Sequence, residues 1–249
     1  MEIEIIKTNI VNIEADAIVI PANSSLKEGS GVSAAVFQAA GRRKLTRACE
    51  KIGSCETGYA VPTLAYDLDA KYIIHAVVPK WTDGEHEEYN LLSSAYLSAL
   101  NAADVMECES IAFPLLASGN NGFDPETAFE IAMKSIGSFS GEKLKKAFLI
   151  LHGYHITSYS REMGYEVAEV PENMKELLAE KEKRERAEKR RQELNEFLNT
   201  ILTQEITKAK NYLEDPERRA EIMRMGAEIG GEVIKKIVEK RVQTNEDLI

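Results

Sequence analysis

Short apolar runs alternate with helix-like segments along the first part of the chain, and no other feature of the sequence constrains the fold as strongly. The run 17–20 is apolar throughout, which is typical of a strand buried on both faces of a sheet. Similar patterns predict strands at 3–5, 59–64, 72–78, 110–113, 146–151 and 165–170, and helices at 33–52, 89–105 and 125–139. This repeat predicts an α/β fold, a three-layer α/β/α sandwich with a mostly parallel central sheet.

Charge and glycine content both change near Pro171. The 249 residues carry a net charge of −10, of which residues 1–171 hold −9, and twelve of the fifteen glycines also lie in that part. A boundary near Pro171 follows, with one domain at 1–171 and an all-α extension at 172–249.

The extension is predicted to form two long helices with a break near Pro216. Charges of both signs alternate in the first helix, between apolar stripes at its two ends. In the second helix, Gly226 and Gly230 allow a close helix crossing, and one apolar face contains Ile222, Met225, Ile229, Val233, Ile237 and Val238. Two helices cannot bury such stripes alone. We therefore expect them to pack on the first domain, on a second copy in an oligomer or coiled coil, or on a partner protein.

Composition argues against several classes of protein. The acidic excess disfavours a surface that binds nucleic acid or anionic lipid. No apolar run approaches the roughly 20 residues that span a bilayer, and the first residues lack the basic region of a signal peptide, so we expect a soluble, cytoplasmic protein. The three cysteines form no CxxC pair, so no disulfide framework is expected. His152 and His155 lack a partner at metal-ligand spacing, and the acidic neighbours of His86 are interpreted as an exposed loop and not as metal ligands, so neither a metal site nor a cofactor is expected.

Two glycine-containing loops, 21–33 and 114–125, each follow a predicted strand and precede a predicted helix. Gly29 and Gly31 permit a positive φ and a close approach of the backbone, and Ser33 lies where the next helix begins. Because helix N-termini expose N–H groups, each loop can surround phosphate oxygens. Loops that follow parallel strands meet at one edge of a sheet, so together they predict an anion site.

Several segments resemble, in order and spacing, the macro domain family. They are Ala15–Leu26 with its Pro-Ala-Asn-Ser-Ser-Leu, Gly29-Ser30-Gly31-Val32 leading to Gly41, Cys55–Ala60, Ala70–Trp81 with its His-Ala-Val-Val-Pro, and Ile111–Phe123 with its Ser-Gly-Asn-Asn-Gly-Phe. The resemblance covers residues 1–169 and implies the same three-layer sandwich. It also implies recognition of ADP-ribose or a derivative, with hydrolysis of ADP-ribosyl or O-acetyl-ADP-ribose esters in some branches.

The resemblance assigns roles to individual residues. The first loop would lie against the diphosphate and distal ribose, the second would close over the same phosphates, and Asn23 would bind the distal ribose. The implied ligand-binding residues are Asn9, Ile10, Ala22, Asn23, Gly29, Ser30, Gly31, Val32, Ser118, Gly119, Asn120, Asn121, Gly122 and Phe123. The implied catalytic residues are Asn23 and Ser33. As an alternative, Asn23 is a turn residue whose amide satisfies local backbone.

Departures from the family pattern affect both ends of the ligand. Ser33 replaces an acidic residue that would position or deprotonate water, and a serine hydroxyl is no general base unaided, so turnover would depend on the substrate's own phosphate and be slow. Asn9 replaces an Asp that accepts from the adenine amino group. The aromatic residue that packs on adenine falls on Leu151 or His152, with Tyr154 close behind.

These observations support three hypotheses. The leading one is a domain that binds ADP-ribose, free or attached to a protein, with slow substrate-assisted hydrolysis as an added activity. A second is a non-catalytic scaffold that acts through residues 172–249. A third is a binder of another nucleotide-like phosphorylated ligand, because Asn9 and Leu151 depart from the family pattern.

Overall fold

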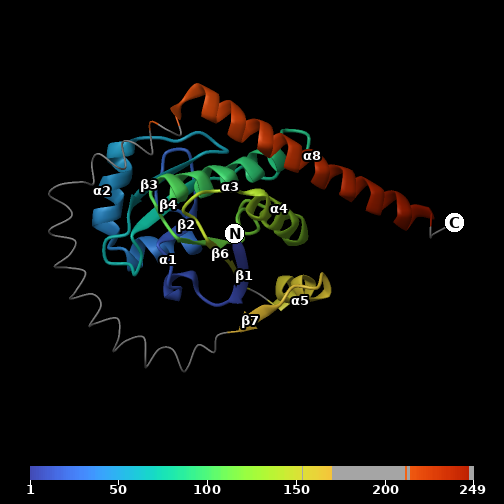
Figure 1. Ribbon diagram of the computed structural model, residues 1–249, viewed down its shortest axis with the longest axis horizontal. Helices are drawn as coiled ribbons and strands as arrows, with labels where there is room; N and C mark the ends of the chain where they lie inside the picture. Colours follow the sequence, from blue (N-terminus) through green and yellow to red (C-terminus); the bar gives the residue numbers. More distant parts are fainter. Residues whose placement is uncertain (153, 170–210, 212–213, 247–249) are drawn as a thin grey trace.

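The structure, a computed structural model, describes residues 1–152, 154–169, 211 and 214–246 (Figure 1). Its seven-stranded sheet has the order β3-β4-β2-β5-β6-β1-β7. The strands are β1 (Glu2–Lys7), β2 (Ala17–Ala22), β3 (Ala60–Leu64), β4 (Tyr72–Val77), β5 (Ser110–Pro114), β6 (Lys146–Leu151) and β7 (Val167–Glu169). Every neighbouring pair is parallel except β3 and β4. The mostly parallel sheet is confirmed.

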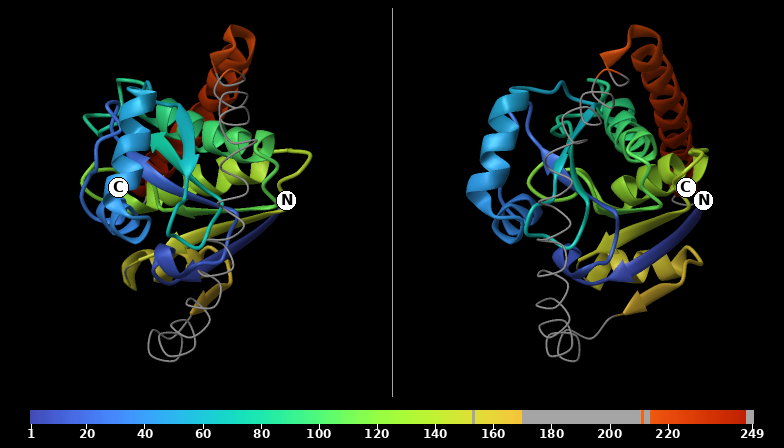
Figure 2. Two further views of the ribbon diagram at one scale, coloured as in Figure 1. Left: turned by 90° about the vertical axis from the view of Figure 1, so that its left-hand side faces the viewer. Right: turned by 60° about the vertical axis from the view of Figure 1, so that its left-hand side comes forward.

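Helices cover both faces of this sheet (Figure 2). The helices are α1 (Val32–Ala39), α2 (Arg42–Ile52), α3 (Glu88–Val105), α4 (Pro125–Ser138), α5 (Tyr154–Glu162) and α8 (Pro216–Glu246), with a 3₁₀ turn, η1 (Ile10–Asn12). Helices α1 and α2 lie on one face, and α3 and α4 lie on the other. The predicted three-layer sandwich is confirmed.

The apolar run of β2 is explained by the two covered faces. Successive side chains of a strand point to opposite faces. Ile18 and Ile20 accordingly belong to the core on the α1 and α2 side, and Val19 belongs to the core on the α3 and α4 side. All three are fully buried. A strand in this position has no solvent face and therefore no polar alternation.

The helix predicted over 33–52 is instead two helices. Helix α1 ends at Ala39, and Gly41 adopts a left-handed φ of 87° before α2 begins at Arg42. A side chain at Gly41 would also meet the carboxylate of Asp67. The prediction of one helix is wrong. The left-handed backbone of Gly41 interrupts the helical hydrogen bonds, but the apolar spacing before and after it is the same as in one continuous helix, so the spacing did not reveal the break.

Helix α8 packs on α3 and α4 of the same chain and lies outside them as an additional layer (Figure 2). Ile222 and Ile229 are buried in this contact. The helices approach closely because Gly226 and Gly230 have no side chains: a Cβ at these positions would lie 2.0 Å from the Ser94 Oγ and 1.8 Å from the Asn90 Oδ1. The described start of α8 therefore buries its apolar face against its own domain.

Part of the extension lies outside this description. The first predicted helix falls largely on residues 170–210, outside the described residues, and the side chains of Val233, Ile237 and Val238 also lie outside the described part. The last turns of α8 extend beyond the domain (Figure 1).

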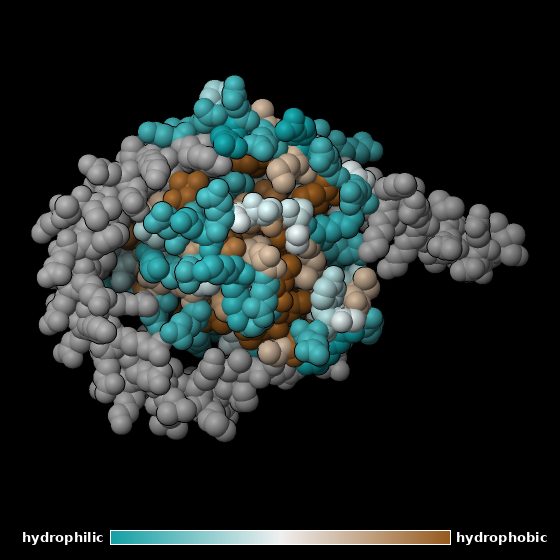
Figure 3. All heavy atoms as spheres, in the orientation of Figure 1, coloured by the Kyte–Doolittle hydropathy of each residue, from teal (hydrophilic) through white to brown (hydrophobic). Residues whose placement is uncertain are grey.

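In the face shown in Figure 3, polar residues surround apolar ones near the centre. Among the described helices, none is both long and apolar enough to cross a membrane.

Candidate functional site

A cavity of about 1010 Å³ lies at the carboxyl edge of the sheet, where β1, β2, β4, β5 and β6 end. Both glycine-containing loops contribute to its walls. Of the residues predicted from the sequence, those lining the cavity are Asn9, Ile10, Ala22, Asn23, Gly29, Ser30, Gly31, Val32, Ser33, Ser118, Gly119, Asn120 and Asn121. Segments more than a hundred residues apart thus meet in one concave site.

The charge of the lining differs from that of the whole chain. The protein has a net charge of −10, but within the described residues no Asp or Glu lines the cavity, and Lys80 is its one Lys or Arg. His152 and His155 add two further nitrogen groups. Among the described residues, an anion in this cavity therefore meets no carboxylate in direct contact.

The first loop ends at the N-terminus of α1. Gly31 precedes the helix with a φ of 59°, a conformation that costs little only for glycine, and no side chain caps the helix. The N–H groups of the first turn are therefore available to an external acceptor. The Ser33 Oγ accepts a hydrogen bond from the Gly29 N–H at 3.0 Å. Ser33 thus fixes the path of the loop, whatever else its hydroxyl does.

Asn23 makes three hydrogen bonds within its own loop. Its Oδ1 accepts from the Ser25 hydroxyl at 2.8 Å and from the Lys27 N–H at 3.1 Å, and its Nδ2 donates to the Lys27 carbonyl at 2.8 Å. This is the turn role considered as the alternative. An amide has two acceptor sites and two donor hydrogens, so one N–H of Asn23 is left for a ligand, while both acceptor sites are used.

The second loop is tied to the first across the cavity. The Asn120 Nδ2 donates to the Ser30 Oγ at 2.7 Å, which joins residues ninety positions apart. The Asn121 Nδ2 donates to the Pro79 carbonyl at 2.8 Å, and the Asn121 carbonyl accepts from the Trp81 N–H at 2.7 Å. The loop is thereby connected to two neighbouring walls.

Gly122 and Phe123 do not line the cavity, in contrast to the roles expected for them. The Phe123 side chain is 2% exposed and packs edge-on against Trp81, with ring centroids 5.2 Å apart, and against Tyr89 at 6.3 Å. A large aromatic ring gains more from burial in this cluster than from a place beside solvent. The buried Phe123 ring holds the loop on the core, and Gly122 makes the turn that leads to Phe123, with a φ of 81°.

The opposite end of the cavity is formed by residues after β1 and β6. The Asn9 Oδ1 accepts from the Val11 N–H at 3.2 Å and so caps η1, which leaves one acceptor site on that oxygen. Leu151 is fully buried in β6, whereas His152 is exposed and lines the cavity. His152 rather than Leu151 is therefore placed to contact a ring there. The side chain of Tyr154 lies outside the described part.

Sequence reasoning assigned no role to two residues that line the end near β4. Thr57 and Lys80 belong to segments that carried the family resemblance, but neither is part of a glycine loop. Their position depends on the pairing of β4 with β2, which brings the end of β4 beside Asn23. The one available signal was a lysine two residues after a predicted buried strand.

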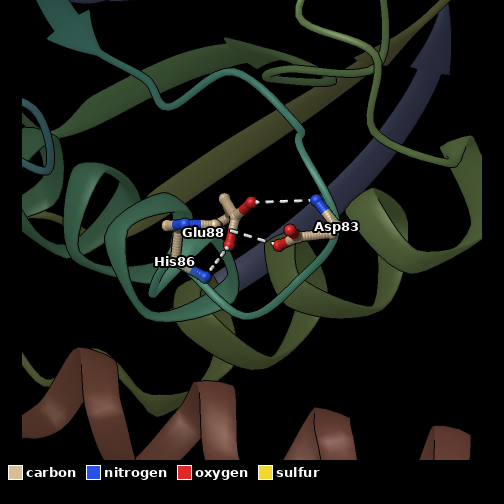
Figure 4. A group of neighbouring side chains, drawn as sticks. All are labelled: Asp83, His86 and Glu88. Atoms are coloured by element: carbon tan, nitrogen blue, oxygen red, sulfur yellow. Dashed lines mark hydrogen bonds and ion pairs between the residues drawn. The ribbon is translucent and has the colours of Figure 1, made fainter.

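Asp83, His86 and Glu88 form a compact group at the start of α3 (Figure 4). One ligand atom from each lies within 4.8 Å of the others. The Glu88 carboxylate, however, accepts N–H groups of Thr82, Asp83, Gly84 and His86 at 2.7–3.4 Å. Burial raises the pKa of Glu88, but these donors outweigh it and hold the pKa at about 2. The carboxylate thus stabilises a turn.

Comparisons with known proteins agree on one family. The family model described as "Macro domain" matches residues 19–132. A macro domain-containing protein of Caldanaerobacter subterraneus subsp. tengcongensis is 45% identical over 154 residues, which cover 60% of this chain and 88% of that protein. A protein of Escherichia fergusonii named O-acetyl-ADP-ribose deacetylase is 44% identical over 141 residues, covering 55% of this chain and 78% of the relative.

Solved structures show the same fold. An Oceanobacillus iheyensis macrodomain with ADP has a TM-score of 0.59 and 29% sequence identity, and the match covers 63% of this chain and 87% of that one. A Trypanosoma brucei macrodomain in complex with ADP-ribose has a TM-score of 0.58 and 27% identity, covering 66% and 69%.

Proposed function

This chain belongs to the macro domain family, and we propose that it binds ADP-ribose or an ADP-ribose derivative in the cavity between its two glycine-containing loops. The single observation that carries this proposal is the contrast between an acidic chain and a cavity lined by no Asp or Glu among the described residues. Backbone N–H groups at the start of α1 provide the counterpart for a diphosphate without a cluster of basic side chains.

The proposed orientation follows the order of strands along the sheet edge. Adenine would lie near Asn9 and His152, at the β1 and β6 end. The diphosphate would lie between the two loops, and the distal ribose would lie near Asn23, beside the ends of β2 and β4. Asn23 would donate its remaining N–H to a ribose oxygen, since its acceptor sites are used within the loop.

A slow hydrolysis of an ester on the distal ribose is the finer part of the proposal. Relatives named O-acetyl-ADP-ribose deacetylase are 41–44% identical to this chain. No carboxylate lines the cavity among the described residues, and the Ser33 hydroxyl is engaged with the Gly29 N–H. A positioned general base contributes about 10²- to 10⁴-fold, so turnover that depends on the substrate's phosphate would be slower by that order.

Calorimetry with ADP-ribose, ADP and AMP tests the binding proposal. We expect ADP-ribose to bind with the highest affinity of the three, with amide shifts at Gly31 and Gly119 in NMR spectra. Inorganic phosphate serves as the control for unspecific anion binding. Absence of heat with ADP-ribose together with unshifted amides would exclude it.

The hydrolytic part is tested with O-acetyl-ADP-ribose. We expect slow acetate release by the native chain and a further loss in Asn23→Ala. Equal release by both would remove Asn23 from the mechanism, and no release by the native chain would leave a binding module.

The scaffold hypothesis has less support from the described residues. Ile222 and Ile229 are buried against the same chain, so this part of the apolar face is not free for a partner. A mass measurement in solution tests the hypothesis, and we expect a monomer.

A further inference from the structure

Helix α8 contacts, through one arginine, the segment that contributes Thr57 to the cavity wall. The Arg219 Nη2 donates to the Glu56 Oε2 at 2.5 Å, and the Arg219 guanidinium lies over the Tyr59 ring, 4.3 Å from its centroid. Glu56 and Tyr59 flank Thr57, which lines the cavity. Arg219, which is far from the segment 55–59 in sequence, thus contacts this segment both before and after Thr57.

The segment 55–59 is joined at its two ends to the walls near β2 and β4. The Cys55 N–H donates to the Ser24 carbonyl at 2.9 Å, and the Gly58 N–H donates to the Val77 carbonyl at 2.8 Å. Ser24 and Val77 both line the cavity. Between these bonds, the Tyr59 N–H donates to the Glu56 carbonyl at 3.2 Å, and Arg219 adds a side-chain contact from α8 to Glu56. The turn that carries Thr57 is therefore held by backbone bonds to the walls near β2 and β4 and by a side-chain contact from α8.

Arg219 is itself held in place by the packing of α8. The Asp215 carboxylate accepts N–H groups of Glu217 and Arg218 at 3.0 Å and so caps the first turn. Ile222, one turn further along, is buried on α3. The arginine thus projects from a helix that is fixed on the domain.

We propose that α8 is a functional part of the cavity, and that Arg219 is a positioning residue that holds Thr57 in the wall at the β4 end. This inference rests on the proposed function, because it assigns that end to the distal ribose. A ligand that reaches this end would depend on Arg219, and a ligand that stops at the diphosphate would not. The extension beyond residue 171 would therefore determine affinity for the ribose end of the ligand.

The test compares ADP-ribose with ADP, which lacks the distal ribose, on variants of the full chain. For Arg219→Ala we expect ADP-ribose affinity to fall about three- to tenfold, as for loss of one partly exposed cation–π contact and ion pair, with ADP affinity unchanged. Arg219→Lys should recover part of the loss. Glu56→Gln should give a smaller loss, because the Tyr59 contact remains, and should add little to Arg219→Ala.

Two controls separate a local effect from a general one. Arg224→Ala removes an exposed arginine of the same helix, and Lys134→Ala removes an ion pair of α8 that lies away from segment 55–59. Both should bind ADP-ribose like the native chain. An Arg219→Ala variant with native ADP-ribose affinity, or with equal losses for ADP-ribose and ADP, would overturn the proposal.

Hydrogen exchange tests, without any ligand, whether Arg219 holds the segment 55–59 in place. In Arg219→Ala we expect faster exchange at the Cys55, Gly58 and Tyr59 amides, and native exchange in α3. If the native chain binds no ADP-ribose, the proposed function fails, but the exchange rates of these amides still test whether Arg219 holds the segment. Native exchange rates at all three amides in Arg219→Ala would show that Arg219 does not hold the segment 55–59.

Discussion

The two glycine-containing loops face the same cavity but are supported in different ways. The first is held by short polar side chains of its own, with Ser33 on the Gly29 N–H and Asn23 on Lys27. The second is held by contacts with residues outside its segment, through Phe123 in an aromatic cluster and through Asn121 on the Pro79 carbonyl. Both loops bury an apolar side chain, Leu26 in the first and Phe123 in the second, but the polar side chains of the first loop bond mainly within it.

This difference teaches where damage to each loop would be felt. A local hydrogen bond between loop residues contributes little to global stability, because water replaces it in the unfolded chain. A buried ring contributes much more, because its removal leaves a cavity. Removal of the buried ring of the second loop should therefore destabilise the protein, and changes to the polar side chains of the first loop should mainly affect the ligand.

The largest effect is expected for Phe123→Ala. Removing this buried ring from its cluster with Trp81 and Tyr89 should lower the free energy of unfolding by about 3–5 kcal/mol. Denaturant unfolding measures it. Phe123→Leu, which keeps most of the volume, should lose less. A loss below about 1 kcal/mol for the alanine variant would show that the second loop does not depend on this anchor.

A loss of about 2 kcal/mol at pH 7 is expected for Glu88→Gln, because hydrogen bonds to a carboxylate contribute more than those to an amide. The folded-state pKa of about 2 lies below the ordinary 4.5. Glu88 therefore stabilises the fold fully above pH 4.5, and this contribution is lost as pH falls through 2. The stability difference between native chain and variant should shrink over that range.

Unfolding curves at several pH values measure this difference. The matched control is Glu85→Gln, which changes an exposed residue of the same turn and should leave the unfolding free energy unchanged at every pH. A difference that grows on acidification would contradict the assignment.

A smaller effect, about 1 kcal/mol, is expected for Ser33→Ala, which leaves the Gly29 N–H without its acceptor. Ligand affinity should respond as well, because the loop carries Gly31 to the start of α1. Unfolding and calorimetry are measured together, with exposed Ser54→Ala as the control. Native ADP-ribose affinity in Ser33→Ala would show that the loop keeps its path without this bond.

The smallest effect is expected for Asn120→Ala, which removes the exposed hydrogen bond between the loops. Its unfolding free energy should stay within about 0.5 kcal/mol of native, while ADP-ribose affinity falls about two- to threefold. Gln38→Ala on α1 provides an exposed control. A loss of stability above 1 kcal/mol would indicate that the two loops are coupled through the fold and not only through the ligand.

Much of the site could be predicted because it follows local rules. Gly31 lies between a strand and a helix, and its positive φ is a property of its own backbone. The role of Phe123 could not be predicted, since a Gly-Phe pair at a loop end looks the same above a cavity or below it. Thr57 and Lys80 were missed because strand order, not sequence order, places them beside Asn23.

The sequence by itself determined the alternation of strands and helices, the parallel sheet and the two loops at its edge, because apolar periodicity and glycine conformation act over a few residues. Only the tertiary structure decided which side chains of those loops face the cavity, and where α8 lies. Those outcomes depend on packing between distant elements: the aromatic cluster that contains Phe123, and the glycines that let α8 approach α3 and bring Arg219 to the segment 55–59.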